Sequence, residues 1–296
     1  MDDRPLVEDV DPEAAFKRLG HQHRLATLLA LDEASALTFS DLRERVGADD
    51  PGGFNYHLRQ LDGLFVEQVE GAYELTPAGR RVVAALHSGA FTSDFVDQTI
   101  DTDHRCLRCD GTLQVHLERK GMSVSCRSCE LRYNHVEIPP RAVVDHDRGE
   151  LFDLVERWVK QWITTAEYGV CPRCDGRMGR RVLRADDPDD WGGAIPGWVQ
   201  DLPVSVVLRY QCERCGETRF GHAAAVAALH PIVAAFHHEH GIDVRRIPLP
   251  DLEWLSLGSA TVASTDPLRI EVVAEVAGDA LRVTFDRDFE LVSSDW

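Results

Sequence analysis

The eight cysteines of this 296-residue chain form four Cys-x-x-Cys pairs, with none left over. The pairs are Cys106/Cys109, Cys126/Cys129, Cys171/Cys174 and Cys212/Cys215. The first two pairs read C-x2-C-x16-C-x2-C, which is typical of a four-cysteine zinc site, and the last two read C-x2-C-x37-C-x2-C. A two-residue gap lets both thiolates of a tight turn face one ion, and two such turns complete a tetrahedron with Zn–S bonds of about 2.3 Å. We therefore expect two structural Zn2+ ions per chain.

Other uses of Cys-x-x-Cys pairs fit the sequence less well. Disulfides are favoured in secreted proteins, whereas the acidic stretch 1–11 lacks the basic-then-apolar order of a signal peptide. A thioredoxin-type redox motif needs a βαβ context and would occur once. A four-cysteine site leaves no position for a reacting water, and no nucleophile–base pair, glycine-rich phosphate loop or paired carboxylates stand out, so we do not expect an enzyme.

An internal repeat indicates how the cysteines are positioned. The segment 106–111 (CLRCDG) matches 171–176 (CPRCDG), and the two returning pairs are followed by similar segments that end at His135 and His222. An apolar, helix-like segment follows each copy. The repeat predicts two zinc ribbons of one design, the second enlarged at its tip by a loop-like insertion.

The first ninety residues show a helical pattern with a short hairpin. Leucines at helical spacing, with a break at Gly20, predict two short helices before residue 31. A further helix is predicted from an N-cap at Ser40 to Gly47, and another over 54–64 after a turn at 48–53.

A hairpin and a last helix complete this part of the chain. Alternating residues over 65–75, on both sides of Gly71, predict a β-hairpin. Thr76 is then an N-cap with Pro77 at the first helical position, and this helix runs through Leu86. Three helices, a hairpin and a helix are the element order of a winged helix-turn-helix.

The residues in this part also resemble one family. Residues 19–31 (LGHQHRLATLLAL), 55–61 (NYHLRQL) and 73–80 (YELTPAGR) look like the ArsR-type winged-helix regulators, and the resemblance covers about residues 12–90. The whole layout, with zinc ribbons and an acidic chain, is similar to that of haloarchaeal ArsR-like helix-turn-helix proteins. The resemblance implies a DNA-binding regulator whose third helix reads the major groove. The metal-sensing branch of that family uses a cysteine motif on its helices, and no cysteine precedes Cys106.

The candidate DNA contacts lie mainly on this third helix. Phe54, Leu58 and Leu61 are expected to face the core, which leaves polar neighbours for base edges and phosphates. The candidates on the helix are Asn55, Tyr56, His57, Arg59 and Gln60, with Arg24, Arg80 and Arg81 as further phosphate contacts. The alternative is a protein–protein module, which the acidic hairpin residues Glu67, Glu70 and Glu74 favour.

The charge balance bears on both readings. Fifty acidic residues face 32 basic ones, only three of the latter are lysines, and the net charge is −18. Such a charge opposes phosphate binding in dilute buffer, but in concentrated salt the Debye length falls to about 3 Å and self-repulsion is screened. We therefore interpret the acidity as halophilic adaptation. We find no apolar stretch long enough to span a bilayer, and expect a soluble, cytoplasmic protein that has no membrane partner.

The sequence divides into five segments of an α+β multidomain fold. They are the winged helix-turn-helix at 1–90, the first ribbon at 91–147, a connecting amphipathic helix at 148–168, the second ribbon at 169–222, and a helix with a small antiparallel sheet at 223–296. The insertion at 184–202 carries Trp191 and Trp198, whose side chains look exposed.

The last segment combines histidines with a strand pattern. We expect a helix over 223–238, followed by four or five strands of period two. One face of this sheet needs cover, from that helix or from a second subunit. The cluster His230, His237, His238 and His240 suggests a second metal site, but ordinary helix-end histidines are the favoured interpretation.

Two functions remain open at this point. The leading one is a transcription regulator that binds double-stranded DNA as a homodimer on a pseudo-palindrome, with structural zinc. The alternative is an adaptor that contacts RNA polymerase or another transcription protein, because a winged helix followed by a zinc ribbon is also similar to the layout of the alpha subunit of archaeal general factor E.

Overall fold

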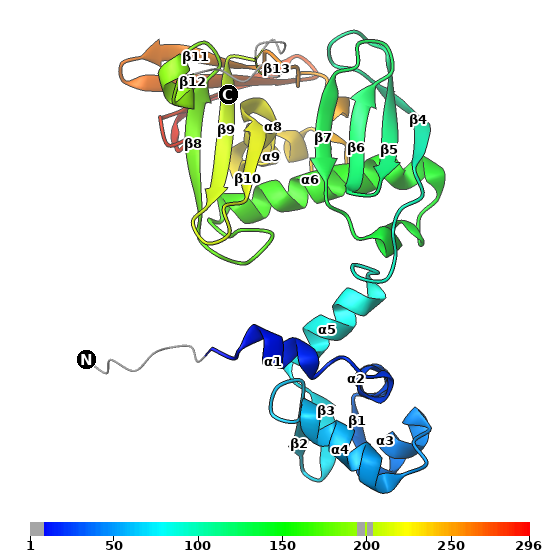
Figure 1. The fold of residues 1–296 in the computed structure, drawn as a ribbon. Coiled ribbons are helices and arrows are strands. Elements are labelled where there is room, and N and C mark those ends of the chain that lie inside the picture. The colour runs from blue at the N-terminus through cyan, green and yellow to red at the C-terminus, as the bar shows by residue number, and fades with distance from the viewer. Residues whose placement is uncertain (1–8, 194–198, 200–203) are drawn as a thin grey trace, which may run out of the picture. The chain divides into compact units, whose positions relative to one another are not determined.

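Figure 1 shows the computed structural model, which describes residues 9–193, 199 and 204–296. The chain divides into two compact units, Met1–Asp94 with Pro139–Arg141 and Phe95–Ile138 with Ala142–Trp296. Each unit has its own hydrophobic core. None of the helices in the described residues is long and apolar enough to cross a membrane.

The first unit is winged helix-turn-helix-like, as the sequence predicts. Its elements are α1 (Pro12–Lys17), α2 (Gln22–Ala34), β1 (Ala36–Thr38), α3 (Phe39–Val46), α4 (Pro51–Leu61), β2 (Val66–Val69), β3 (Ala72–Leu75) and α5 (Pro77–His87). The three strands form an antiparallel sheet in the order β1-β3-β2. Leu28, Leu42, Phe54, Leu58 and Val83 meet in the core, so each of the helices α2 to α5 contributes at least one buried side chain.

Two helices begin earlier than the sequence predicts. The N-cap of α3 is Thr38 and not Ser40, because the Thr38 hydroxyl accepts from the N–H of Asp41. Helix α4 begins at Pro51 because the Asp50 carboxylate accepts from the N–H groups of Gly52 and Gly53, at 3.0 and 2.7 Å. It ends at Leu61 rather than at residue 64, because the chain turns at Asp62 and Gly63. Strand β1 was not predicted.

The hairpin and α5 approach each other closely at one residue. A Cβ on Gly79 would lie 2.1 Å from the carbonyl oxygen of Phe65, so only glycine fits there. The Thr76 hydroxyl caps α5 at the N–H of Gly79 and also donates to the carbonyl of Leu64. The Leu-Thr-x-x-Gly motif thus holds the last helix against the hairpin.

The described residues of the second unit form three antiparallel sheets. Its elements are β4 (Gln98–Arg105), β5 (Thr112–Glu118), β6 (Gly121–Cys126), β7 (Arg132–Val136), α6 (Leu151–Glu167), β8 (Met178–Arg184), β9 (Val206–Cys212), β10 (Thr218–His222), α8 (Ala223–Ala228), α9 (Pro231–Glu239), β11 (Ala260–Thr265), β12 (Leu268–Val276), β13 (Asp279–Phe285) and β14 (Leu291–Asp295). The sheet orders are β4-β5-β6-β7, β10-β9-β8 and β11-β12-β13-β14. Short 3-10 turns are η2 (Arg148–Glu150), η3 (Pro188–Trp191) and η4 (Leu249–Asp251), and a further one, η1 (Pro140–Val143), begins in the segment assigned to the first unit.

The first two sheets are the predicted ribbons. Strands β5, β6 and β7 pair as β8, β9 and β10 do, with the cysteines in equivalent turns. The first ribbon has an additional strand, β4, which the sequence did not predict; its side chains alternate between half-buried and exposed. In the second ribbon, pairing runs from Met178↔Cys212 to Arg184↔Val206, so the insertion lies at the end remote from the cysteines.

One tryptophan of the insertion is not exposed. The ring of Trp191 is half-buried, and its Nε1 donates to the carbonyl of Arg184 at 2.9 Å. The expectation of an exposed Trp191 is wrong because η3 packs this segment against β8. Trp198 lies outside the described residues.

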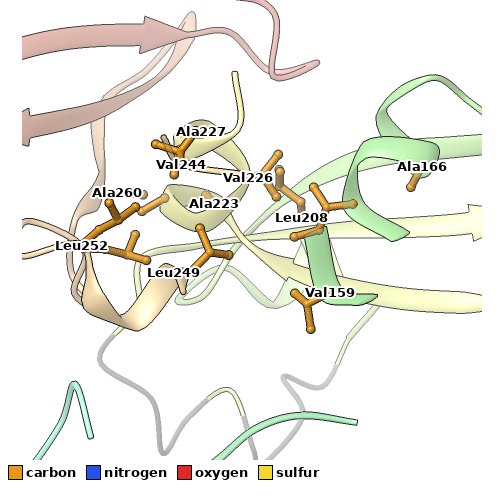
Figure 2. Packing of buried hydrophobic residues seen from close by; sticks show 14 of the residues in the cluster. Val159, Ala166, Leu208, Ala223, Val226, Ala227, Val244, Leu249, Leu252 and Ala260 are labelled. Carbon is orange, nitrogen blue, oxygen red and sulfur yellow. The ribbon is translucent and has the colours of Figure 1, made fainter. Parts of the chain in front are cut away.

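The connecting helix α6 joins the ribbons. It contacts β6 and β7 of the first ribbon and β8 of the second (Figure 1). Its buried side chains include Val159 and Ala166, which belong to the same core cluster as Leu208 of β9, Val226 of α8 and Ala260 of β11 (Figure 2). The apolar stripe of this helix is therefore core.

The C-terminal sheet has four strands, within the predicted number, and helices cover it. The helix predicted over 223–238 is broken into α8 and α9, because Pro231 has no N–H to continue it and the His230 ring caps α9 instead. Helix α8 contacts β12, and the His230 ring meets Phe285 of β13 edge-on at 5.5 Å. This face of the sheet is covered within the chain.

Candidate metal centres and nucleic-acid interface

The four Cys-x-x-Cys turns share one backbone geometry. In each, the residue after the second cysteine has a positive φ and its N–H bonds back to the carbonyl of the first cysteine. These residues are Asp110, Glu130, Asp175 and Gly216, with N···O distances of 2.9, 3.0, 3.0 and 3.1 Å. Three of them are not glycine, and a positive φ at such residues is uncommon. The repetition shows that the sequence repeat is a structural one.

Each turn pair brings four sulfurs together. The Sγ atoms of Cys106 and Cys129 are 3.7 Å apart, and those of Cys109 and Cys126 are 3.5 Å apart. In the second cluster the corresponding distances are 3.8 Å for Cys171 and Cys215 and 3.6 Å for Cys174 and Cys212.

These separations identify the type of site. The edge of a tetrahedron with Zn–S bonds of 2.3 Å is about 3.8 Å, whereas a disulfide requires about 2.05 Å. None of the eight cysteines forms a disulfide, and within each cluster the four Sγ atoms all lie within 4.8 Å of one another. Each cluster is thus able to hold one metal ion, and four thiolates are a donor set that suits zinc.

Backbone N–H groups favour the thiolate form in both clusters. The N–H groups of Ser128 and Arg214 donate to the sulfurs of Cys126 and Cys212, at 3.3 and 3.4 Å. The N–H of Cys215, together with that of Arg214, lowers the pKa of Cys212 to about 6 against the opposing effect of burial. Burial likewise raises the pKa of Cys126, but its N–H donors prevail and lower it to about 7. The thiolate is thus favoured on one cysteine of each cluster, Cys126 or Cys212. The N–H groups of Gly111 and Gly176 lower the pKa of Cys109 and Cys174, but the neighbouring sulfurs and burial outweigh them and raise it to about 12.

Close packing around the first cysteine pair of each cluster explains the Cys-Asp-Gly repeat. A Cβ on Gly111 would lie 2.5 Å from the Ser128 hydroxyl, and one on Gly176 would lie 2.9 Å from the Arg214 side chain. In the first cluster the Tyr133 hydroxyl also donates to Cys106 at 3.3 Å. With four protein donors each, the clusters have the composition of closed, structural sites.

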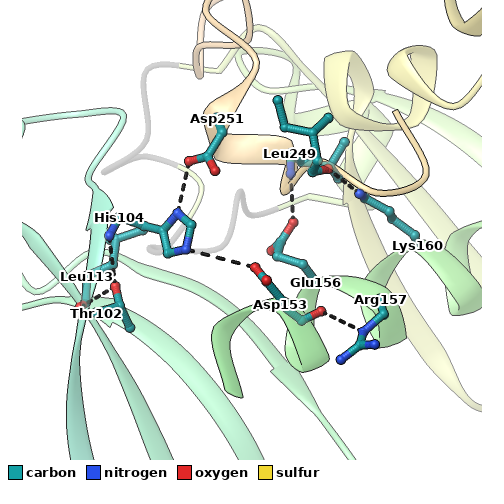
Figure 3. Close-up of polar contacts among 10 residues, drawn as sticks. Thr102, His104, Leu113, Asp153, Glu156, Arg157, Lys160, Leu249 and Asp251 are labelled. Carbon is teal, nitrogen blue, oxygen red and sulfur yellow. Dashed lines mark hydrogen bonds and ion pairs between the residues drawn. The ribbon is translucent and has the colours of Figure 1, made fainter. Parts of the chain in front are cut away.

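A polar cluster that the sequence did not reveal fixes η4 against α6 (Figure 3). The buried Glu156 accepts from the N–H of Leu249 at 3.0 Å, and Lys160 donates to the carbonyl of Ile247. Burial raises the pKa of Glu156, while the Leu249 N–H and Lys160 oppose the rise. The His104 Nδ1 lies 3.0 Å from Asp251 of η4. These contacts join residues far apart in sequence, so no local sequence pattern predicts them.

Helix α4 presents one polar face, as expected. Phe54, Leu58 and Leu61 are buried, with 1%, 2% and 0% of their surfaces exposed. On the other side the predicted candidates are half-buried or exposed: Asn55 and Gln60 are half-buried, and Tyr56 and Arg59 are exposed. The structure therefore brings these four side chains onto one accessible helix, although their contact with DNA stays a prediction.

The remaining candidates are His57, also on α4, and three arginines on helices α2 and α5. Arg80 and Arg81 are exposed in the first turn of α5. Arg24 is half-buried on α2, where its Nη2 donates to the carbonyl of Lys17. The half-buried His57 stacks on His21 with ring centroids 3.8 Å apart, so its ring turns toward α2.

Two of the C-terminal histidines, His237 and His240, have partners of their own. His237 is buried between the carbonyl of Val233 and the indole of Trp254, at 2.7 and 2.8 Å. His240 caps α9 and lies 3.0 Å from Asp279. Their hydrogen bonds give these rings a structural role at the helix end.

Comparisons with known proteins place both parts of the chain among uncharacterised domains. A family model described as a domain of unknown function, DUF7351, matches residues 103–291, which contain all eight cysteines. A second, DUF7347, matches residues 12–86, which correspond to the winged helix. No curated protein and no solved structure matches the chain significantly.

Proposed function

This chain belongs to the DUF7351 family, and we propose that it is a DNA-binding transcription regulator whose two cysteine clusters hold structural zinc. One observation carries the proposal: in a winged helix-turn-helix-like unit, α4 keeps its apolar side chains in the core and leaves Asn55, Tyr56, Arg59 and Gln60 accessible. In this fold the corresponding helix enters the major groove. Asn and Gln suit adenine, and Arg suits guanine.

The motifs that resemble the ArsR type support a regulator of that kind. The Leu-Thr-x-x-Gly motif fixes α5 against the hairpin, through the cap at Thr76 and the close approach at Gly79. We propose a homodimer, since two-fold symmetric winged helices read pseudo-palindromic half-sites one turn of DNA apart. We assign no catalytic step to either cysteine cluster.

The acidic chain defines the conditions in which this function operates. With a net charge of −18, long-range repulsion from phosphates is strong in dilute buffer. At molar salt both this repulsion and the attraction of the arginines are screened within about 3 Å. Direct contacts of α4 with base edges then contribute most of the specificity.

Selection of genomic fragments tests this function. The zinc-loaded full chain is incubated with sheared genomic DNA at molar salt, and bound fragments are sequenced. The proposal predicts enrichment of one motif with two-fold symmetry. Random recovery of fragments at every salt concentration contradicts it.

A protein-contact role in the transcription machinery is the second candidate. The exposed Glu67 and Glu70 make the hairpin acidic, which favours a basic protein surface over phosphate. Copurification with RNA polymerase after nuclease treatment, without any selected DNA motif, would support this adaptor role instead.

A further inference from the structure

Three histidines gather in the first unit, away from the cysteines. His21 is the N-cap of α2, His23 lies in its first turn, and His57 lies in α4. One ring nitrogen from each lies within 4.8 Å of the others. The His57 ring stacks on His21, and His23 meets His21 and His57 edge-on at centroid distances of 5.3 and 5.6 Å. All three rings are half-buried.

One ring of this cluster has an unused polar atom. The Nδ1 of His57 is buried and has no hydrogen-bond partner, although buried polar atoms are normally paired. Its packing, together with His21, Arg24 and His23, keeps the pKa of His57 below its usual value, so the ring is neutral at neutral pH. A neutral imidazole with an unpaired nitrogen is the form that binds metal ions.

We propose that His21, His23 and His57 bind one divalent transition-metal ion of the class that imidazole prefers, such as Zn2+, Ni2+ or Cu2+. Three protein ligands leave a fourth position for water or an added ligand, which distinguishes this site from the closed cysteine clusters. With metal–nitrogen bonds of about 2.0–2.1 Å, the ligand atoms of a tetrahedral site lie about 3.4 Å apart. Since the three nitrogens lie within 4.8 Å of one another, small side-chain rotations bring them to that separation.

Two features oppose the ion and set its affinity below that of a structural site. The Nδ1 of His21 accepts from the N–H of His23 at 3.2 Å. If the ion binds Nδ1 of His21, that nitrogen can no longer accept; if it binds Nε2, the ring proton moves to Nδ1. In both cases the cap bond is lost when the metal bond forms. The guanidinium of Arg24 also contributes positive charge near His57. The metal would tie the first turn of α2 to the middle of α4.

Nickel binding by the untagged full chain tests this site without DNA, so its outcome is separate from that of the DNA-binding proposal. Protein with two zinc ions per chain is dialysed against micromolar Ni2+, and both metals are quantified. We expect one Ni2+ per chain while zinc stays at two. Failure to retain Ni2+, or its uptake only as zinc is lost, overturns the proposal.

Variants locate the ion. His57→Ala and His23→Ala should each weaken Ni2+ binding on the order of 100-fold or more, because even a lost outer contact of a metal ligand costs 10–100-fold. His87→Ala is the matched control: it removes a histidine of the same unit that pairs with Asp32 at 3.1 Å, and it should bind Ni2+ like the parent. Equal binding by all variants contradicts the site.

A measurement on the parent chain covers the case in which a variant fails to fold. Paramagnetic Ni2+ should broaden the ring-proton resonances of His21, His23 and His57 at one equivalent, and leave those of His87 sharp. Broadening confined to other histidines would place the ion elsewhere and overturn the proposal.

Discussion

The first cysteine cluster gives the sharpest test of what holds the second unit together. Cys126 is 1% exposed, its sulfur is 3.5 Å from that of Cys109, and it accepts from the N–H of Ser128. In Cys126→Ser the hydroxyl replaces a thiolate and cannot act as an equivalent ligand at neutral pH. We expect the zinc content to fall from two ions per chain to one.

The size of the effect follows from the energy of such sites. A structural zinc ion contributes about 10–16 kcal/mol of apparent binding free energy at pH 7. The whole stability of a domain is about 5–15 kcal/mol. The unit shares one core between the ribbons, α6 and the C-terminal sheet, so losing this ion should remove the cooperative unfolding transition of the unit.

Calorimetry with metal analysis provides the assay, and a neighbouring residue provides the control. Ser128→Ala keeps the backbone N–H that donates to Cys126 and all four thiols of the cluster, so it should retain two zinc ions and the parent melting profile. If Cys126→Ser also bound two zinc ions and melted like the parent, the assignment of this cluster as a structural site would be refuted.

Two further perturbations probe each unit separately. Gly79→Ala forces a Cβ against a backbone carbonyl oxygen 2.1 Å away. The clash should cost about 1–3 kcal/mol and lower the melting temperature of the first unit by on the order of 10 °C. The control is Gly20→Ala, whose Cβ meets only one backbone oxygen, at 3.9 Å, and should not lower it; equal melting of the two variants would contradict the packing described. The carbonyl of Phe236 and the carboxylate of Asp279 raise the pKa of His240 above 6.5. The pair of His240 and Asp279 therefore stabilises the fold fully below about pH 6.5, and this stabilisation is lost as the pH rises through the raised pKa. Asp279→Asn should therefore lower the melting temperature at pH 6 and leave it unchanged at pH 8.5, as thermal denaturation at both pH values would show.

Local sequence signals predicted much of the fold. The cysteine spacing predicted both clusters, because each Cys-x-x-Cys turn is complete within six residues and supplies two of the four sulfurs of its cluster. Thr76-Pro77 predicted the start of α5, and Gly71 the hairpin, since caps and tight turns depend on a few adjacent residues. The repeat predicted that the second ribbon has the design of the first.

Other features depended on distant partners and could not be read locally. Strand β1 has three residues and exists because it pairs with β3, about 36 positions further along. The contact between Glu156 and the N–H of Leu249 spans 93 positions, and the helical period of α6 gave no sign that this position is buried. The spacing His-x-His at the start of α2 was a visible signal, but its third partner, His57, lies on another helix.

Binding of α4 to base edges is tested by comparing the DNA affinities of three proteins. A selected genomic fragment is titrated at fixed molar salt with the parent chain, with Arg59→Ala and with Arg157→Ala, which removes an exposed helical arginine of the other unit. Loss of an arginine contact to a base costs about 1–3 kcal/mol, or about 5- to 150-fold. We predict that Arg59→Ala weakens the affinity for the fragment by this factor and that Arg157→Ala leaves it unchanged. Equal affinity of all three proteins would contradict DNA reading by α4.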